Sequence, residues 1–180
     1  MLDYEWLLRG WEKILQRLSS FEWVATLLIR LFVGYFFFET GWAKLHNLDA
    51  FTQRFVQWGI PHPAFNAALS AYTECIGGAL TVAGLGMRFI SIPMIINMVV
   101  AIITVKMKNV AGLDDFVELD EPLYGLIYFW LMFSGAGWVS IDALIKRYVT
   151  AVIRQDQPAF QSKSQVRENG HLSSATPTAQ

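Results

Sequence analysis

The sequence predicts an all-α integral membrane protein, a four-helix bundle preceded by an amphipathic interfacial helix. Of its 180 residues, 54% are hydrophobic and 16% are charged, whereas a soluble domain carries about 25% charged residues. Four segments approach the roughly 20 apolar residues that a helix needs to span a bilayer. The single cysteine, Cys75, excludes an intramolecular disulfide framework. A net charge of −1 argues against nucleic acid as a partner, because binding it requires a basic face.

Residues 1–20 form the first predicted unit, an amphipathic helix. Its apolar residues recur at helical spacing, and basic residues such as Arg9, Lys13 and Arg17 lie elsewhere on it. Such a helix lies in the membrane interface. The alternative is a helix that packs on the soluble surface of a partner.

The second predicted unit, residues 21–148, is the membrane domain. Its spans are expected at Trp23–Leu45, Ala64–Gly86, Phe89–Val105 and Pro122–Ile141, of which the last two contain no charged residue. The segments between spans one and two and between spans three and four are expected to be loops. The third unit, residues 149–180, is polar and lacks apolar periodicity, which predicts a disordered tail.

Basic residues predict the orientation, because Lys and Arg are enriched in cytoplasmic segments. One side of the predicted membrane domain carries Arg9, Lys13, Arg17, Arg88, Lys146, Arg147, Arg154, Lys163 and Arg167. The other side carries only Lys44, Arg54, Lys106 and Lys108. We therefore expect a multi-pass protein of the bacterial cytoplasmic membrane with both termini in the cytoplasm.

Three polar residues inside the predicted spans are candidates for a functional layer. Arg30, Glu74 and Asn97 fall at similar depths in spans one, two and three. Ionisable groups inside a bilayer are costly, so each is a functional-site hypothesis. One interpretation is a neutralising pair that fixes helix register, and the other is a site that handles protons, quinone or substrate.

Several residues near these charges are predicted to have structural roles. Gly34 and Gly41 share a helix stripe with Arg30 and Lys44, which would allow a neighbouring helix to approach closely. Small residues of span two, Gly77 and Gly78, are typical of a packing face. Arg88 and Asp142 are expected to pair as an anchor at the cytoplasmic boundary.

A weak metal-site hypothesis concerns three residues near the outer surface. Glu39 and His46 lie on one helix face, and His62 follows in the next segment; imidazole and carboxylate groups suit several divalent metals. This spacing is more typical of a solvated interface. No covalent haem is expected, because the chain has no CxxCH motif.

An ordered set of small motifs resembles the DoxX family over roughly residues 25–145. The motifs are Arg30-x3-Gly34, Gly41-x2-Lys44-Leu45, Gly59-Ile60-Pro61, Glu74-x2-Gly77-Gly78, Gly84-x-Gly86-x-Arg88 and Gly135-x-Gly137-x2-Ser140-Ile141-Asp142. The resemblance implies a four-helix protein of the bacterial or archaeal cytoplasmic membrane. It also implies association with redox complexes, as a small subunit of thiosulfate:quinone or quinol oxidase systems or as an anchor for sulfurtransferase and superoxide dismutase partners.

The resemblance brings no assigned catalytic residues, so the catalytic residues are unknown. If quinone is the cofactor, Arg30, Lys44 and Glu74 are the positions expected to bind it and handle protons. The leading functional interpretation is an accessory subunit that anchors or serves a membrane redox complex, with the lipid bilayer and other subunits as partners. The alternative is a quinol-binding subunit of an oxidoreductase. A second alternative is a small transporter or metal-stress protein.

Overall fold

The computed structural model describes residue 4, residues 11–13, residue 15 and residues 21–154. These residues are helical or lie in turns and connections, and they contain no β-strand, which confirms the all-α class. Most of the interfacial helix predicted over residues 1–20 and most of the tail predicted over residues 149–180 lie outside the described residues; residues 4, 11–13 and 15 are helical.

Four long helices correspond to the predicted spans: α2 (Glu22–His46), α4 (Pro63–Ala83), α5 (Met87–Thr104) and α7 (Asp120–Ser134). By length and composition, Glu22–His46 and Met87–Lys108 are apolar enough to cross a membrane. The 15 residues of α7 cover only about 22 Å at the helical rise, less than the roughly 30 Å of a hydrocarbon core. The structure therefore supports a membrane protein with two clear spans, and the count of four stays a prediction.

The two segments expected to be loops contain short helices. Helix α3 covers Leu48–Gln57, and the 3₁₀ helix η1 (Lys106–Asn109) precedes α6 (Leu113–Val117). Leu48, Phe51 and Phe55 follow helical spacing, and the two phenylalanines are buried against Ala67 and Ala71 of α4. Burial of this apolar face stabilises α3 where a loop was expected.

The predicted fourth span is not one continuous helix. Helix α7 ends at Ser134, and residues 135–140 form an irregular segment before the helix over residues 141–154. Gly135 and Gly137 have φ angles of 76° and 74°, a left-handed conformation that interrupts a right-handed helix.

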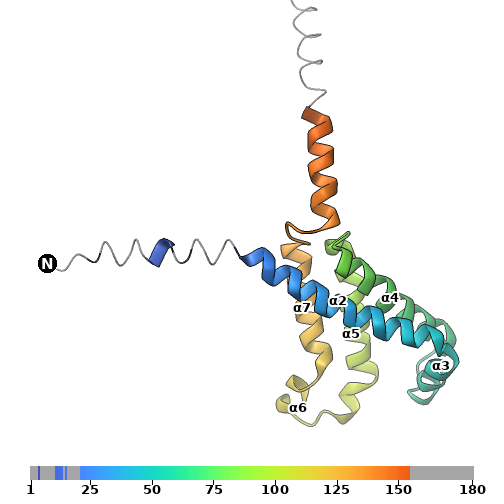
Figure 1. Ribbon diagram of the computed structural model, residues 1–180. Coiled ribbons are helices and arrows are strands. Elements are labelled where there is room, and N and C mark those ends of the chain that lie inside the picture. The colour runs from blue at the N-terminus through green and yellow to red at the C-terminus, as the bar shows by residue number, and fades with distance from the viewer. Residues whose placement is uncertain (1–3, 5–10, 14, 16–20, 155–180) are drawn as a thin grey trace, which may run out of the picture. The chain divides into compact units, whose positions relative to one another are not determined.

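The long helices pack in antiparallel pairs, α2 with α4 and α5 with α7, as Figure 1 shows. Helix α4 also contacts α5. A main apolar core joins α2, α5, α7 and the segment after α7, and it consists of Val33, Phe37, Met87, Met94, Met98, Tyr128, Leu131 and Ala136. Aromatic contacts link α2 to α7, with the Phe36 and Tyr124 rings stacked at 5.0 Å between centroids.

Glycines set the register of α2 against α4. A Cβ atom added at Gly41 would lie 2.3 Å from the backbone nitrogen of Cys75, and one at Gly78 would lie 2.3 Å from the nitrogen of Phe38. The two backbones are therefore in direct contact, as glycine allows in membrane helix pairs. This contact places Gly41 opposite Glu74 and Cys75, and Gly34 opposite Gly78.

The outer faces of the long helices expose large apolar side chains, which is the expected pattern for a surface in contact with lipid rather than water. Phe32 of α2, Phe65 of α4, Phe89 of α5 and Phe133 of α7 are all largely exposed. This pattern extends to α4 and α7, although neither is among the two clear spans.

A second unit begins after Asp142, and its described part, residues 143–154, is helical. The first six residues of the tail predicted over 149–180 are thus helical in the structure. Leu144, Tyr148 and Val152 recur every four residues on this helix and are exposed, which gives it an apolar stripe.

Candidate functional site

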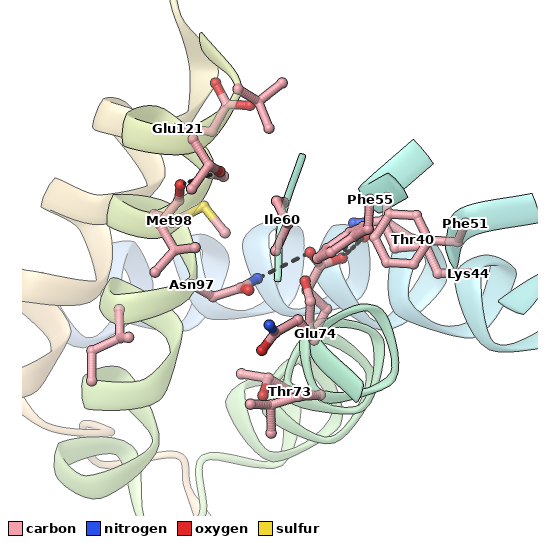
Figure 2. A pocket seen from close by; sticks show the side chains of 18 of the residues that line it. Thr40, Lys44, Phe51, Phe55, Ile60, Thr73, Glu74, Asn97, Met98 and Glu121 are labelled. Carbon is pink, nitrogen blue, oxygen red and sulfur yellow. Dashed lines mark hydrogen bonds and ion pairs between the residues drawn. The ribbon is translucent and has the colours of Figure 1, made fainter. Parts of the chain in front are cut away.

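The membrane domain contains a cleft of about 780 Å³. Residues of α2, α3, α4, α5 and α7 line it, as Figure 2 shows in part. Its walls are largely apolar and aromatic, and charged groups occur at a few points. The polar lining includes Thr40, Lys44, Arg54, Asn66, Ser70, Thr73, Glu74, Asn97, Thr104, Lys106, Asp120 and Glu121.

Glu74 is the centre of the main polar cluster in the cleft. Lys44 Nζ donates to Glu74 Oε2 at 2.5 Å, and Thr40 Oγ1 donates to the same oxygen at 3.4 Å. Asn97 Nδ2 donates to the other oxygen, Oε1, at 3.1 Å. The Glu74 side chain is only 6% exposed, whereas that of Lys44 is 30% exposed. The carboxylate is therefore buried with both oxygens satisfied, and its counter-ion faces the cleft (Figure 2).

The cluster follows from local geometry. Thr40 and Lys44 are four residues apart on α2, so they share a face. The close contact of Gly41 with Cys75 brings that face against Glu74 on the antiparallel helix α4. Asn97 completes the cluster from α5, which also packs against α4.

Aromatic residues form two walls of the cleft. On the α3 side, Phe51 and Phe55 meet edge to face at 4.9 Å, and Trp58 lies next to Phe55. On the opposite side, Phe36 and Tyr124 stack. A flat apolar ring can stack on such surfaces. Lys44 Nζ lies 5.1 Å from the centre of the Phe51 ring, within the range of a cation–π contact.

A second ion pair lines the same cleft. Lys106 Nζ lies 2.9 Å from Glu121 Oε1, and the Glu121 side chain is 17% exposed. Its other oxygen, Oε2, is buried and has no hydrogen-bond donor in the described part of the chain. Of the three carboxylates that line the cleft, Glu74 is fully satisfied, Glu121 is half satisfied, and Asp120 is exposed.

The structure does not bring Arg30 into the predicted layer with Glu74 and Asn97. Arg30 is buried and donates to four backbone carbonyls, those of Thr81, Val82, Val139 and Ala136. Thr81 lies seven residues from Glu74 on α4, or about 10 Å along the axis. The register set by the glycines therefore places Arg30 opposite the end of α4, and Lys44 is the cation that reaches Glu74.

Arg30 donates to backbone carbonyls at the ends of two elements, and one of them, that of Thr81, also accepts from the Gly84 backbone nitrogen at 3.2 Å. Two of its acceptors belong to the last turn of α4, where Gly84 ends the helix in a left-handed conformation. The others belong to the irregular segment after α7. Carbonyls without partners are costly inside a membrane, so this arginine joins the two ends. Arg30 is not among the residues that line the cleft.

Asp142 does not pair with Arg88 as expected. Both of its carboxylate oxygens accept from the backbone nitrogen of Gly86, at 2.9 and 3.0 Å. Among the described ion pairs there is none between Arg88 and Asp142. Gly86 is the N-cap of α5, whose first backbone N–H groups need acceptors. Gly77, which was predicted to belong to a packing face of span two, faces Met94 of α5.

The predicted metal candidates are not assembled. His46 Nδ1 lies 2.9 Å from the carbonyl oxygen of Trp42, and its ring packs on the Trp42 ring. His62 is the N-cap of α4 and has a φ of 48°. Glu39 is exposed on α2. Within the described residues there is no group of three His, Cys, Asp or Glu side chains that could hold a metal ion.

Sequence reasoning missed Thr40, Phe51 and the pair Lys106–Glu121. The helical spacing of Phe51 and Phe55 is a signal that could have placed α3 beside the cleft. No sequence signal indicates the second pair, because its members lie on either side of an irregular connection. Only the packing of α5 against α7 brings them together.

The fold and the cleft define an α-helical membrane protein with an amphipathic cleft, and comparison with known proteins gives the family. A family model for DoxX matches residues 25–107, and the chain belongs to the DoxX family. A relative from Bacillus subtilis named "Putative oxidoreductase CatD" is 38% identical over 127 residues, which are 71% of this chain and 90% of the relative. The "Uncharacterized membrane protein Rv3486" of Mycobacterium tuberculosis is 31% identical over 140 residues, 71% of this chain and 85% of that protein. No solved structure matches the chain.

Proposed function

We propose that this DoxX protein is a membrane component of a redox system and that its cleft binds the ring of a quinone or quinol. The observation that carries the proposal is the Lys44–Glu74 pair, which lies at 2.5 Å in a cleft with aromatic walls. A quinone has a flat apolar ring and polar oxygens at its edge. The aromatic walls can stack on the ring, and the ion pair can form hydrogen bonds with the oxygens.

The charged groups of the cleft supply both kinds of hydrogen bond. The Lys44 ammonium can donate to a quinone carbonyl oxygen, and a carboxylate can accept from a quinol hydroxyl. A bound quinone supplies two-electron, two-proton redox chemistry. Lys44 and Glu74 are positioned to hold or move a proton at the ring oxygens, as was expected of these two residues. Asn97 and Thr40 fix the orientation of the Glu74 carboxylate through their hydrogen bonds.

The role in the redox system is that of an accessory subunit. Reduction or oxidation of the ring requires an electron-transferring partner, and we propose that this chain anchors such a partner at the membrane. The printed name of the Bacillus subtilis relative, an oxidoreductase, supports a redox context. The location would be the bacterial cytoplasmic membrane, because both relatives described above come from bacteria and one is named a membrane protein.

The test is gentle purification of the full chain in mild detergent. The extract is analysed for lipid-soluble quinones by liquid chromatography and for co-purifying proteins by mass spectrometry. We expect about one quinone per chain in the wild type and a large loss in Glu74→Gln. Glu118→Gln is the matched control, because Glu118 is exposed and lies outside the cleft. A well-folded wild-type preparation that neither retains quinone nor binds added decylubiquinone would overturn the proposal.

The same purification also tests the accessory role. We expect one redox protein to co-purify with the wild type in constant ratio and to remain with Glu74→Gln, because that substitution lies inside the cleft. A preparation that turns over decylubiquinol with a soluble electron acceptor and without any partner protein would contradict the accessory role and favour the enzymatic alternative.

A further inference from the structure

Glu121 Oε2 is an orphaned acceptor at the cleft. Glu121 lies in the first turn of α7, and its other oxygen accepts from Lys106. The Oε2 atom is buried and finds no donor among the described residues. Buried polar atoms are nearly always hydrogen-bonded, and an unsatisfied one costs about 1–3 kcal/mol. A carboxylate oxygen in this state favours a ligand that brings a donor.

Glu74 and Glu121, the two largely buried carboxylates among the three that line the cleft, differ in this respect. Glu74 accepts from Lys44, Thr40 and Asn97, so both of its oxygens are already paired. Glu121 keeps one oxygen without a donor from the described part of the chain. An ionised carboxylate has no proton to donate. The free oxygen can therefore bind an O–H or N–H group, but it repels a carbonyl oxygen.

We propose that Glu121 is a ligand-binding residue that makes the cleft select the reduced, hydroxyl-bearing form of its ring ligand. This inference rests on the proposed function, because it assumes that a quinone or quinol ring enters the cleft. A quinol hydroxyl can donate to Glu121 Oε2, whereas the carbonyl oxygen of the corresponding quinone cannot. The selectivity thus comes from a residue outside the Lys44–Glu74 cluster.

The test compares two redox forms of one probe. Binding of decylubiquinol, kept reduced under anaerobic conditions, and of decylubiquinone is measured by calorimetry on the full chain in detergent. A hydrogen bond to a charged acceptor corresponds to a change of about tenfold or more in affinity. We expect the wild type to bind decylubiquinol at least about tenfold more tightly. The dimethyl ether of decylubiquinol, which has no hydroxyl donor, should bind as weakly as the quinone.

The variant Glu121→Gln then tests whether Glu121 is the source of the preference for decylubiquinol. Its side-chain amide supplies a donor in place of a carboxylate oxygen, so we expect the preference for decylubiquinol to fall to within about threefold or to reverse. Glu118→Gln, exposed and outside the cleft, should keep the wild-type preference. Thermal unfolding of each variant shows whether it is folded.

The outcomes separate this inference from the proposed function. Binding of both redox forms by the wild type with equal affinity would overturn the selectivity and leave the quinone site intact. The same conclusion follows if folded Glu121→Gln keeps the full preference. If the wild type binds neither form, the proposed function itself fails. If Glu121→Gln does not fold, the comparison of decylubiquinol with its dimethyl ether on the wild type still tests whether the cleft selects a hydroxyl donor.

Discussion

The Lys44 ammonium lies 2.5 Å from Glu74 Oε2 and 5.1 Å from the centre of the Phe51 ring. One cation therefore connects α2 to both α4 and α3 at the cleft. Glu74 is almost fully buried, whereas Lys44 remains partly exposed. Loss of either partner consequently leaves a charge with poor solvation, and it changes the polar group presented to a ligand.

Replacement of Glu74 by glutamine should destabilise the protein. The variant leaves Lys44 without its counter-ion, and breaking a largely buried pair costs about 1–4 kcal/mol. The measurement is thermal or denaturant unfolding in detergent, monitored by tryptophan fluorescence. We expect a clear drop in the unfolding midpoint.

A double variant separates stability from ligand binding. Replacement of both partners, Lys44→Met with Glu74→Met, removes the two charges together, which is often neutral for stability. We expect the double variant to recover most of the stability lost in Glu74→Gln. Quinone binding should not be recovered. Wild-type binding by the folded double variant would show that the pair has no role in recognition.

Arg30→Lys should lower the stability by about 2–4 kcal/mol, because a lysine cannot reproduce the planar fork that serves four carbonyls. Arg88→Lys is the control, since Arg88 is exposed. Unfolding midpoints give the difference. Under conditions where Arg30→Lys is folded, its affinity for decylubiquinone should equal that of the wild type, because Arg30 does not line the cleft. A selective loss of affinity would assign Arg30 a direct role in binding.

Gly41→Ala should disrupt the α2–α4 pair. The new Cβ would lie 2.3 Å from the Cys75 backbone nitrogen, so the helices must move apart and the Lys44–Glu74 distance must change. The matched control is Gly125→Ala in α7, where the nearest atom, Met98 Cβ, is 4.0 Å away. We expect Gly41→Ala to lose both stability and quinone binding. Gly125→Ala should be neutral or more stable by up to about 1 kcal/mol. Equal midpoints for the two variants would contradict the close contact.

The basic residues predict that both termini lie in the cytoplasm. An alkaline phosphatase fused after Gly112 should be active, because that segment is expected on the outer side. A green fluorescent protein fused after residue 154 should fluoresce, since it folds in the cytoplasm. The reverse pattern would invert the proposed topology and place Lys106 on the inner side.

The helices were predictable where the apolar pattern was long. Helix α2 matches its predicted segment closely, because 25 residues of apolar sequence leave little choice of structure. Helix α3 and the end of α7 were not predicted. The first depends on burial of Phe51 and Phe55 against α4, and the second depends on the left-handed conformation of Gly135 and Gly137.

The sequence by itself determined that this chain is an α-helical membrane protein of the DoxX family and that Arg30, Glu74 and Asn97 are polar exceptions within apolar segments. These conclusions follow from composition, periodicity and ordered motifs. Only the tertiary structure decided which charges meet. Arg30 and Lys44 lie on one stripe of α2, and the sequence suggested Arg30 as the partner of Glu74. The contact of Gly41 with Cys75 sets the register, so Lys44 reaches the carboxylate and Arg30 reaches the end of α4 instead. The register of two helices depends on where their backbones touch. The residue pattern along one helix does not give the position of that contact.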